Sequence, residues 1–263
     1  MLTHQDNEVK NSLKQRLFQI GVQDPSYEAR IILSYTADEQ EIERVLQRRS
    51  TFEPLSKIFE DKGFYRHSFI TTKDTLDPRP DSELFIEILE KTFSQDSALT
   101  LADFGVGTGC LLFSALLHFK NWTGTGYDMS DAALDVARRN IEKFTLQDRV
   151  RLEKKDCFVQ PSFSDSFDVV LANPPYLSAA EYEQIDAQTM HDPKMSLTIS
   201  DDGLSPYCAL SRDVSFLKPG GFLLLEVGYT QSQEVQKIFQ HLEFLGAEKD
   251  FGGHTRILTY RRN

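Results

Sequence analysis

From residue 99 onward, short apolar segments of strand length alternate with segments whose apolar residues recur at helical spacing. The strand-like segments are LTLADFG (99–105), WTGTGYD (122–128), RVRLE (149–153), FDVVLA (167–172) and FLLLEVG (222–228), followed by a last pair between residues 247 and 260. The helical segments cover 109–119, 130–144, a stretch capped by Ser205 with Pro206 in its first turn, and 232–242. Such alternation indicates a parallel sheet with helices on both faces, and therefore an α/β fold.

The first 75 residues have a different pattern, which is typical of a small helical domain. Four short stretches have apolar residues at helical spacing: 9–20, the segment after Asp24 and Pro25, 42–46, and the segment after Pro54. The stretch GFYRHSFIT (63–71) then predicts a strand or hairpin that links the two parts. We therefore divide the chain into an N-terminal helical domain with its hairpin linker, residues 1–75, and an α/β domain, residues 76–263.

The composition of the 263-residue chain narrows the classes of partner and compartment. Its net charge of −11 and its pI near 5.1 oppose the phosphate contacts that give many nucleic-acid-binding proteins their affinity. No direct, specific nucleic-acid partner is therefore expected. The polar N-terminus and the lack of any apolar run of about 18 residues predict neither a secretory signal nor a membrane span, and hence a cytoplasmic protein.

The cysteines and histidines show no metal-binding pattern. Cys110, Cys157 and Cys208 are widely spaced and form no Cys-x-x-Cys pair. An odd, scattered set of cysteines suits a reducing compartment and disfavours a zinc site, so no metal is expected. The histidines are scattered too, and we interpret them as surface or structural residues.

The segment LADFGVGTGC (101–110) predicts a sharp turn from a strand into a helix. The loop consists of Gly105, Val106, Gly107, Thr108 and Gly109. Glycines allow a ligand to approach the main chain closely. The G-x-G-x-G spacing differs from the G-x-G-x-x-G of dinucleotide-binding loops, and no P-loop lysine follows, so phosphate binding is disfavoured. A tight turn without a ligand remains the alternative.

Acidic residues follow the next two predicted strands. Asp128 ends the second strand, where a carboxylate can accept hydrogen bonds from ribose hydroxyls. Asp156 ends the third strand and is placed to lie over an adenine. Acidic residues at strand ends also cap helices and form turns, and this remains the alternative for each of them.

The glycine loop and the two acidic residues together resemble the class I S-adenosylmethionine-dependent methyltransferases. Over residues 76–263 the resemblance implies a Rossmann-like sheet of seven strands with an antiparallel last strand. It also implies that the loop 105–109 passes under the methionine part of S-adenosyl-L-methionine, that Asp128 holds the ribose, and that Asp156 and Cys157 flank the adenine.

Asn173, Pro174, Pro175 and Tyr176 directly follow the strand 167–172, at the end where open α/β sheets bind ligands. The prolines alone fit the end of a strand. The four residues also resemble the (Asn/Asp/Ser)-Pro-Pro-aromatic signature of methyltransferases that alkylate an NH2 group conjugated to a π system. The Asn173 side-chain oxygen and the Pro174 carbonyl would each accept one N–H, and Tyr176 would stack on the planar group. The motif leaves an amide and an adenine equally open.

Seven stretches, in order, resemble the peptide chain release factor N5-glutamine methyltransferase family. They are PLSKIFEDKGFY (54–65), DPRPDSELFIE (77–87), LADFGVGTGC (101–110), NPPYLS (173–178), HDPKMSLTISDDGL (191–204), KPGGFLLLEVGYTQ (218–231) and DFGGHTR (250–256). The resemblance implies N5-methylation of the glutamine in the Gly-Gly-Gln motif of class I peptide chain release factors, with S-adenosyl-L-homocysteine as product.

The same resemblance implies roles for further residues. The helices within 1–75 would dock the release factor, the residues from Asn173 to Tyr176 would take the glutamine amide, and Asn173 would also border the cofactor. Arg79 and Pro80 would lie near the mouth of the active site. The alternative for these two residues is a linker turn before a helix capped by Asp81.

Four positions depart from the usual pattern of the family. Lys57 replaces a usual aromatic residue, Glu60 a usual glycine and Val106 a usual small hydroxyl residue. Cys157 stands where a tryptophan or phenylalanine is common beside adenine, so Phe158 is an alternative stacking partner.

Other functions remain open beside this one. A glutamine methyltransferase acting on a ribosomal protein shares the motif and the chemistry. An N6-adenine DNA methyltransferase would flip its base onto the same four residues, but the net charge of −11 opposes it. A non-catalytic adaptor would have no use for two acceptors of an amine.

Overall fold

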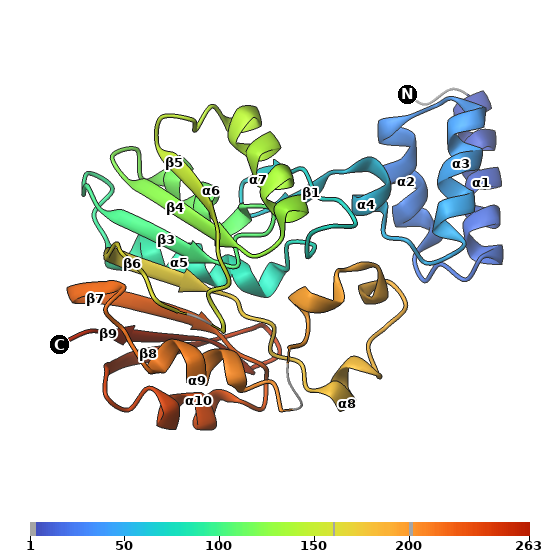
Figure 1. Cartoon of the computed structure of the whole chain (residues 1–263). Helices are drawn as coiled ribbons and strands as arrows, with labels where there is room; N and C mark the ends of the chain where they lie inside the picture. The colour runs from blue at the N-terminus through green and yellow to red at the C-terminus, as the bar shows by residue number, and fades with distance from the viewer. Residues whose placement is uncertain (1–3, 160, 200–201) are drawn as a thin grey trace.

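A mixed seven-stranded sheet forms the centre of the larger part of the molecule (Figure 1). The computed structural model describes residues 4–159, 161–199 and 202–263. The strand order is β5-β4-β3-β6-β7-β9-β8, in which the first five strands are parallel and β9 runs antiparallel to both neighbours. The strands are β3 (Thr100–Phe104), β4 (Thr123–Asp128), β5 (Val150–Lys154), β6 (Phe167–Ala172), β7 (Leu217–Glu226), β8 (Glu243–Lys249) and β9 (Thr255–Arg261). The predicted α/β fold with an antiparallel last strand is confirmed.

Both faces of β3, β4 and β6 are buried, as expected for strands between two layers of helices, whereas the edge strand β5 has no buried residue. Side chains alternate along a strand, so Leu101 of β3 belongs to the core on one face and Ala102 to the core on the other. The first face packs against α5 (Leu84–Thr92), α6 (Cys110–His118) and α7 (Asp131–Phe144), and the second against α9 (Ser205–Ser211) and α10 (Ser232–Ile238) (Figure 1). Because the parallel strands run in the same direction, the loops that follow them lie at the same edge of the sheet.

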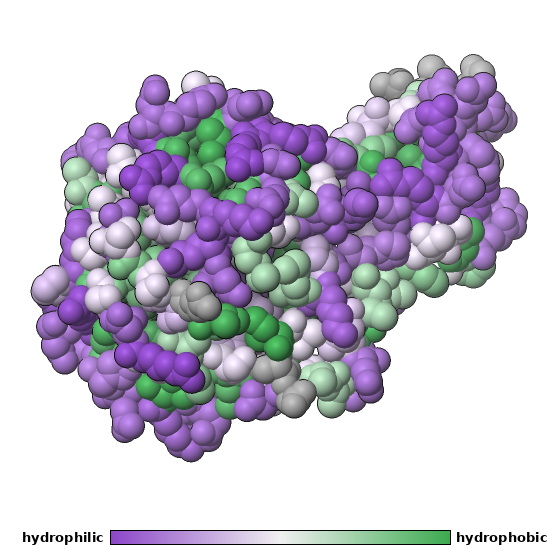
Figure 2. Space-filling view, in the orientation of Figure 1, coloured by the Kyte–Doolittle hydropathy of each residue, from purple (hydrophilic) through white to green (hydrophobic). Residues whose placement is uncertain are grey.

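The four N-terminal helices are where the sequence predicts them. They are α1 (His4–Gln19), α2 (Pro25–Tyr35), α3 (Glu39–Arg49) and α4 (Leu55–Phe59). The Asp24 carboxylate caps α2 by accepting the Tyr27 N–H at 2.9 Å. Buried residues between 13 and 46 give these helices a core of their own, beside the sheet in Figure 1. Their outer surface is mostly hydrophilic in Figure 2.

The predicted hairpin is present, formed by β1 (Lys62–Phe64) and β2 (His67–Phe69), and it begins one residue before the predicted stretch 63–71. Phe64 and Phe69 are buried in the same cluster as β3 and α6, and not in the cluster of the N-terminal helices. The Asn140 side chain of α7 accepts the Ile70 N–H at 2.8 Å and donates to the carbonyl oxygens of Ile70 and Thr108, both at 2.9 Å. The hairpin thus packs with the sheet, and the division of the chain at residue 75 stays a prediction.

The segment between β6 and α9 returns toward the N-terminal helices. It contains α8 (Ala179–Tyr182) and two 3-10 turns, η2 (Thr189–His191) and η3 (Lys194–Ser196). Ser178 and Glu181 form a capping box at the start of α8. Further along, His191 Nε2 lies 2.8 Å from the carbonyl oxygen of Thr51.

Two predicted helix ends are wrong. Ser205 is the first residue of α9 and does not cap it, because the helix starts directly after Leu204 and has no side-chain cap. Helix α10 ends at Ile238 and not at residue 242, because the Phe239 backbone leaves the helical region (φ −97°, ψ +21°). The N–H groups of Gln240 and Leu242 then bond to carbonyl oxygens three residues earlier.

The described residues form neither a membrane-spanning helix nor a cluster of metal ligands. No helix within 4–159, 161–199 and 202–263 is long and apolar enough to cross a membrane. These ranges also contain no group of three His, Cys, Asp or Glu side chains arranged to hold a metal ion.

Candidate functional site

A cleft of about 1000 Å³, counted to its open mouth, lies where β3, β4, β5 and β6 end. Of the predicted site residues, Arg79, Gly105, Val106, Gly107, Thr108, Asp128, Asp156, Cys157, Asn173 and Pro175 line it. Pro80, Gly109, Pro174 and Tyr176 adjoin these residues in the chain without lining the cleft. The structure therefore brings the glycine loop, both acidic strand ends and the start of the Asn-Pro-Pro-Tyr segment around one space.

The glycine loop requires glycine for its backbone and for its packing. Gly105, Gly107 and Gly109 have φ of +80°, +52° and +82°, the region that favours glycine. A Cβ at Gly109 would lie 2.1 Å from the Phe113 ring, and a Cβ at Gly105 would lie 3.2 Å from the Phe158 ring. The backbone conformation and the packing of the turn are thus enough to explain the glycines at 105 and 109. Because the turn lies at the cleft, a ligand there can also reach its main chain.

Asp128, the last residue of the neighbouring strand β4, fixes the conformation of the glycine loop. Its carboxylate accepts the N–H groups of Gly107 at 3.0 Å and of Ser130 at 2.9 Å. Burial raises the pKa of Asp128 above its usual value, although these N–H donors act to lower it. An ionised carboxylate has about four acceptor positions, so Asp128 retains capacity for further donors from the cleft.

Asp156 and Cys157 follow β5 on the wall of the cleft, two residues later than a strand end. Asp156 Oδ1 accepts the N–H groups of Phe158 at 3.0 Å and Val159 at 3.1 Å, so the carboxylate forms the local turn. Cys157 is buried, and burial raises the pKa of its thiol well above the usual value. The adjacent ring is that of Phe158, which lines the cleft beside Gly105.

Asp103 is a further candidate that the sequence prediction did not include. It lines the cleft, is 1% exposed, and neither carboxylate oxygen has a hydrogen-bond partner among the described residues. Burial raises its pKa to about 8 and the Asp128 carboxylate adds to the effect, although the nearby Leu112 backbone N–H acts to lower the pKa. A buried, unpartnered carboxyl group on a cleft is typical of a ligand-binding group. The sequence feature that could have identified Asp103 is an acidic residue in the strand that leads into the glycine loop.

Asn173 lies at the end of β6 with its amide orientation fixed. Its Nδ2 donates to the Ser82 Oγ at 3.3 Å, and Ser82 in turn donates to Glu226. Because the nitrogen faces Ser82, the other end of the amide, Oδ1, is the acceptor available to a substrate. The buried rings of Pro174 and Pro175 stiffen the chain directly after it.

Tyr176 is held by contacts on the protein side of the segment. Its hydroxyl donates to Glu226 Oε1 at 3.3 Å, and its carbonyl oxygen accepts from the Gln231 side chain at 2.8 Å. Burial raises the pKa of Glu226 to about 7, although the Ser82 hydrogen bond and the Arg256 charge act to lower it. Ser82 and Glu226 are residues that the sequence prediction missed, because they lie 91 and 53 residues from Asn173 in the chain.

Arg79 and Pro80 enter the site from the connection before α5. Arg79 lines the cleft, and its Nη2 lies 2.6 Å from Asp192 Oδ2. Pro80 opens the 3-10 turn η1 (Pro80–Glu83), which leads directly into α5. The alternative prediction of a helix capped by Asp81 is wrong, because that carboxylate faces Arg256 at 3.3 Å and makes no cap hydrogen bond.

The strand order, the glycine loop and the cleft together define a class I methyltransferase. The family model described as "Methyltransferase small domain" matches residues 63–198, just over half of the chain. A methyltransferase of known structure from Pyrococcus furiosus has the same fold, with a TM-score of 0.51, 18% identity and coverage of 86% of this chain and 100% of its own.

Curated relatives identify the family more closely. A release factor glutamine methyltransferase from Caulobacter vibrioides is 32% identical over 95% of this chain and 94% of its own length. One from Agrobacterium fabrum is 30% identical with the same coverage. The chain belongs to the release factor glutamine methyltransferase family and is an enzyme of the methyltransferase class.

Proposed function

We propose that this protein transfers a methyl group from S-adenosyl-L-methionine to the side-chain N5 of the glutamine in the Gly-Gly-Gln motif of class I peptide chain release factors. The observation that carries the proposal is the position of Asn173, which lines the same cleft as the glycine loop and has its amide turned by Ser82. The names of the two relatives support the choice of a release factor as substrate.

The residues that line the cleft suit S-adenosyl-L-methionine in their chemistry. The unpartnered carboxyl group of Asp103 would take up the ammonium of the methionine part, and the loop from Gly105 to Gly109 would border it. Asp128 would accept the ribose hydroxyls, and Phe158, Asp156 and Cys157 would surround the adenine. When bound, this cofactor supplies an activated methyl group, and S-adenosyl-L-homocysteine remains after transfer.

Residues of the Asn-Pro-Pro-Tyr segment would hold the nucleophile. An amide nitrogen is a poor nucleophile because its lone pair is delocalised. Asn173 Oδ1 and the Pro174 carbonyl would each accept one N–H of the glutamine amide, which fixes its plane and raises the electron density on nitrogen. Tyr176 would close the segment against water, held by Glu226. Positioning of this kind can supply up to about 7–11 kcal/mol of the lowering of the barrier.

The N-terminal helices and the segment that begins at Arg79 would have different roles in binding the release factor. The N-terminal helices would dock the body of the release factor, and Arg79 and Pro80 would border the entry of its glutamine loop. The fold and the cleft are equally compatible with a ribosomal protein as methyl acceptor, so the acceptor has to be tested directly.

The test is methylation of purified acceptors with labelled S-adenosyl-L-methionine. Unmethylated release factor, ribosomal proteins and adenine-containing duplex DNA are offered separately, and mass spectrometry locates the added methyl group. We expect label only on the glutamine of the Gly-Gly-Gln motif. Label on a ribosomal protein or on DNA, with none on the release factor, would overturn the proposal.

A further inference from the structure

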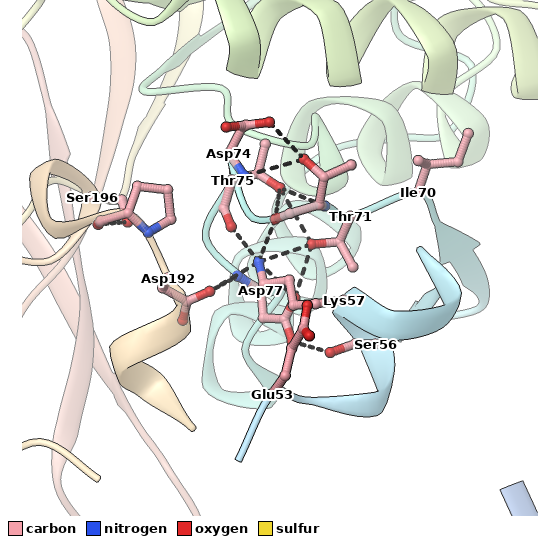
Figure 3. A network of polar contacts seen from close by, with 12 residues as sticks. Glu53, Ser56, Lys57, Ile70, Thr71, Asp74, Thr75, Asp77, Asp192 and Ser196 are labelled. Carbon is pink, nitrogen blue, oxygen red and sulfur yellow. Dashed lines mark hydrogen bonds and ion pairs between the residues drawn. The ribbon is translucent and has the colours of Figure 1, made fainter. Parts of the chain in front are cut away.

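A buried lysine, Lys57, joins three segments behind the cleft (Figure 3). It belongs to α4, and its side chain is 1% exposed. Its ammonium donates to the carbonyl oxygen of Thr72 at 2.8 Å and to that of Thr75, and it lies 3.0 Å from a carboxylate oxygen of both Asp77 and Asp192. A lysine has three donors, so these contacts satisfy it fully.

Asp192 is the point at which the three segments meet. Besides Lys57, it accepts the Asp77 N–H at 3.0 Å and the Arg79 guanidinium at 2.6 Å. Two cations, Lys57 and Arg79, thereby balance two anions, Asp77 and Asp192. Burial acts to raise the pKa of Asp77, but the Lys57 charge and hydrogen bonds from Ser56, Lys57 and Thr71 hold it below the usual value. Each charged side chain of the network therefore faces at least one side chain of opposite charge.

The network fixes two walls of the cleft relative to each other. Asp77 and Arg79 belong to the wall before α5, whereas Asp192 directly precedes Pro193, the first residue of the wall formed by Pro193, Met195, Ser196 and Ile199. Lys57 comes from the N-terminal helices, so it also fixes the position of these helices relative to both walls. A paired network of this kind constrains geometry because removing one partner leaves an unpaired buried charge.

We propose that Lys57 and Asp192 are positioning residues for the protein substrate of this enzyme. They act through Arg79 and the 193–199 wall. They fix the position of the entry to the cleft relative to the N-terminal helices, which receive the substrate. The proposal rests on the proposed function, since it requires a protein loop to enter between these walls. It assigns a role to Lys57, which stands where the family usually has an aromatic residue.

The experiment compares steady-state methylation of unmethylated release factor by the full-length wild-type protein and by Lys57→Met, Lys57→Arg and Asp192→Asn. We expect Lys57→Met and Asp192→Asn to raise KM for the release factor by about tenfold, with kcat changed by less than about threefold. Calorimetry should give an unchanged Kd for S-adenosyl-L-methionine in these variants. Lys57→Arg, which keeps the positive charge, should raise KM less than Lys57→Met does. Asp192→Asn keeps the size of the side chain and carries the test if Lys57→Met does not fold.

Lys218→Met is the matched control. Lys218 pairs with Asp168 at 2.7 Å at the opposite, amino ends of β6 and β7, so its loss should lower stability without changing KM. A folded Asp192→Asn protein with wild-type KM would overturn the inference alone. So would a Lys218→Met protein whose KM rises as far as that of Asp192→Asn at an equal loss of thermal stability, because destabilisation alone would then explain the rise. A wild-type protein that methylates no release factor would overturn the proposed function and, with it, this inference.

Discussion

Asp103, which lines the cleft, and Glu226, which lies against Ser82 and Tyr176, are buried carboxyl groups with different partners and therefore different roles. Glu226 accepts hydrogen bonds from Ser82 and Tyr176, whereas Asp103 has no partner among the described residues. Burial raises the pKa of Glu226 to about 7 and that of Asp103 to about 8. Glu226 therefore serves the internal order of the site, while Asp103 is the group suited to a cationic ligand.

Asp103 predicts a pH-dependent affinity for S-adenosyl-L-methionine. Below its pKa of about 8 the carboxyl group is mostly protonated in the free protein, and a cationic ligand requires the ionised form. Affinity should therefore rise with pH, by about 20-fold between pH 6 and pH 7.5, as the carboxyl group gives up its proton. Calorimetry in buffers of different ionisation enthalpy measures both the Kd and the released proton. Asp103→Asn should bind more weakly and lose this pH dependence, and an equal slope in both proteins would contradict the assignment.

Substitutions of Asn173 and Ser82 should lower kcat to different degrees. Asn173→Ala removes the acceptor proposed for the amide, and we expect kcat to fall by about 100-fold or more with little change in cofactor affinity. Ser82→Ala keeps the acceptor but releases its orientation, so its kcat should lie between those of Asn173→Ala and the wild type. Single-turnover methylation and cofactor calorimetry separate the two effects. Full turnover by Asn173→Ala would contradict the proposed clamp.

At the scale of elements, Glu60 shows how a departure from the family pattern is accommodated. It ends α4 in the left-handed region, with φ of +51°, and its carboxylate pairs with Arg139 of α7 at 2.6 Å. Both side chains of that pair are about half exposed, so the ion pair contributes little to stability. The usual glycine at this position follows from the conformation of the backbone.

Replacing Glu60 by glycine should therefore be tolerated. Relief of the left-handed conformation offsets the lost ion pair and the added freedom of the unfolded chain, so Glu60→Gly should change stability by less than about 1 kcal/mol. Glu43→Gly is the matched control, because Glu43 is also exposed and pairs with an arginine, Arg16, but lies inside α3. It should cost about 1 kcal/mol or more in urea unfolding. Equal losses in the two variants would contradict this account of α4.

The elements that sequence patterns predicted best were those with local signals. Asp24 and Pro25 determine where α2 begins, and the glycine loop determines the turn after β3. Asp81 and Ser205 were misassigned as caps, because a capping residue type shows that a cap is possible and does not show where its side chain bonds. The partnerships of Lys57 with Asp77 and Asp192 had no local signal at all, since they depend on how distant segments fold together.

At the scale of the whole molecule, the hairpin belongs by its contacts to the sheet. Phe64 and Phe69 are at most 1% exposed and pack in the core that includes Leu101 and Leu112. Asn140 connects the residue after the hairpin, Ile70, to the glycine loop at Thr108. The apolar periodicity predicted the N-terminal helices and the α/β sheet, both of which the structure contains, but the change of pattern near residue 75 does not show which core the hairpin fills.

Two truncated proteins locate the boundary of the unit that folds. A fragment of residues 61–263 keeps the hairpin, whereas a fragment of residues 76–263 removes Phe64 and Phe69. Loss of a buried phenylalanine side chain costs about 3–5 kcal/mol, and a whole domain is stable by only about 5–15 kcal/mol. We therefore expect the first fragment to unfold cooperatively and to bind S-adenosyl-L-methionine, and the second to do neither.

Both fragments lack Lys57, so both carry Asp192→Asn to avoid an unpaired carboxylate beside Asp77. Near-ultraviolet circular dichroism, thermal unfolding and cofactor calorimetry compare them with full-length Asp192→Asn. If the fragment 76–263 folds and binds the cofactor as well as 61–263, the hairpin is a linker, as the predicted division at residue 75 has it. If only 61–263 does so, the catalytic unit includes the hairpin and begins with β1. Release-factor methylation by that fragment then measures what the N-terminal helices contribute to KM.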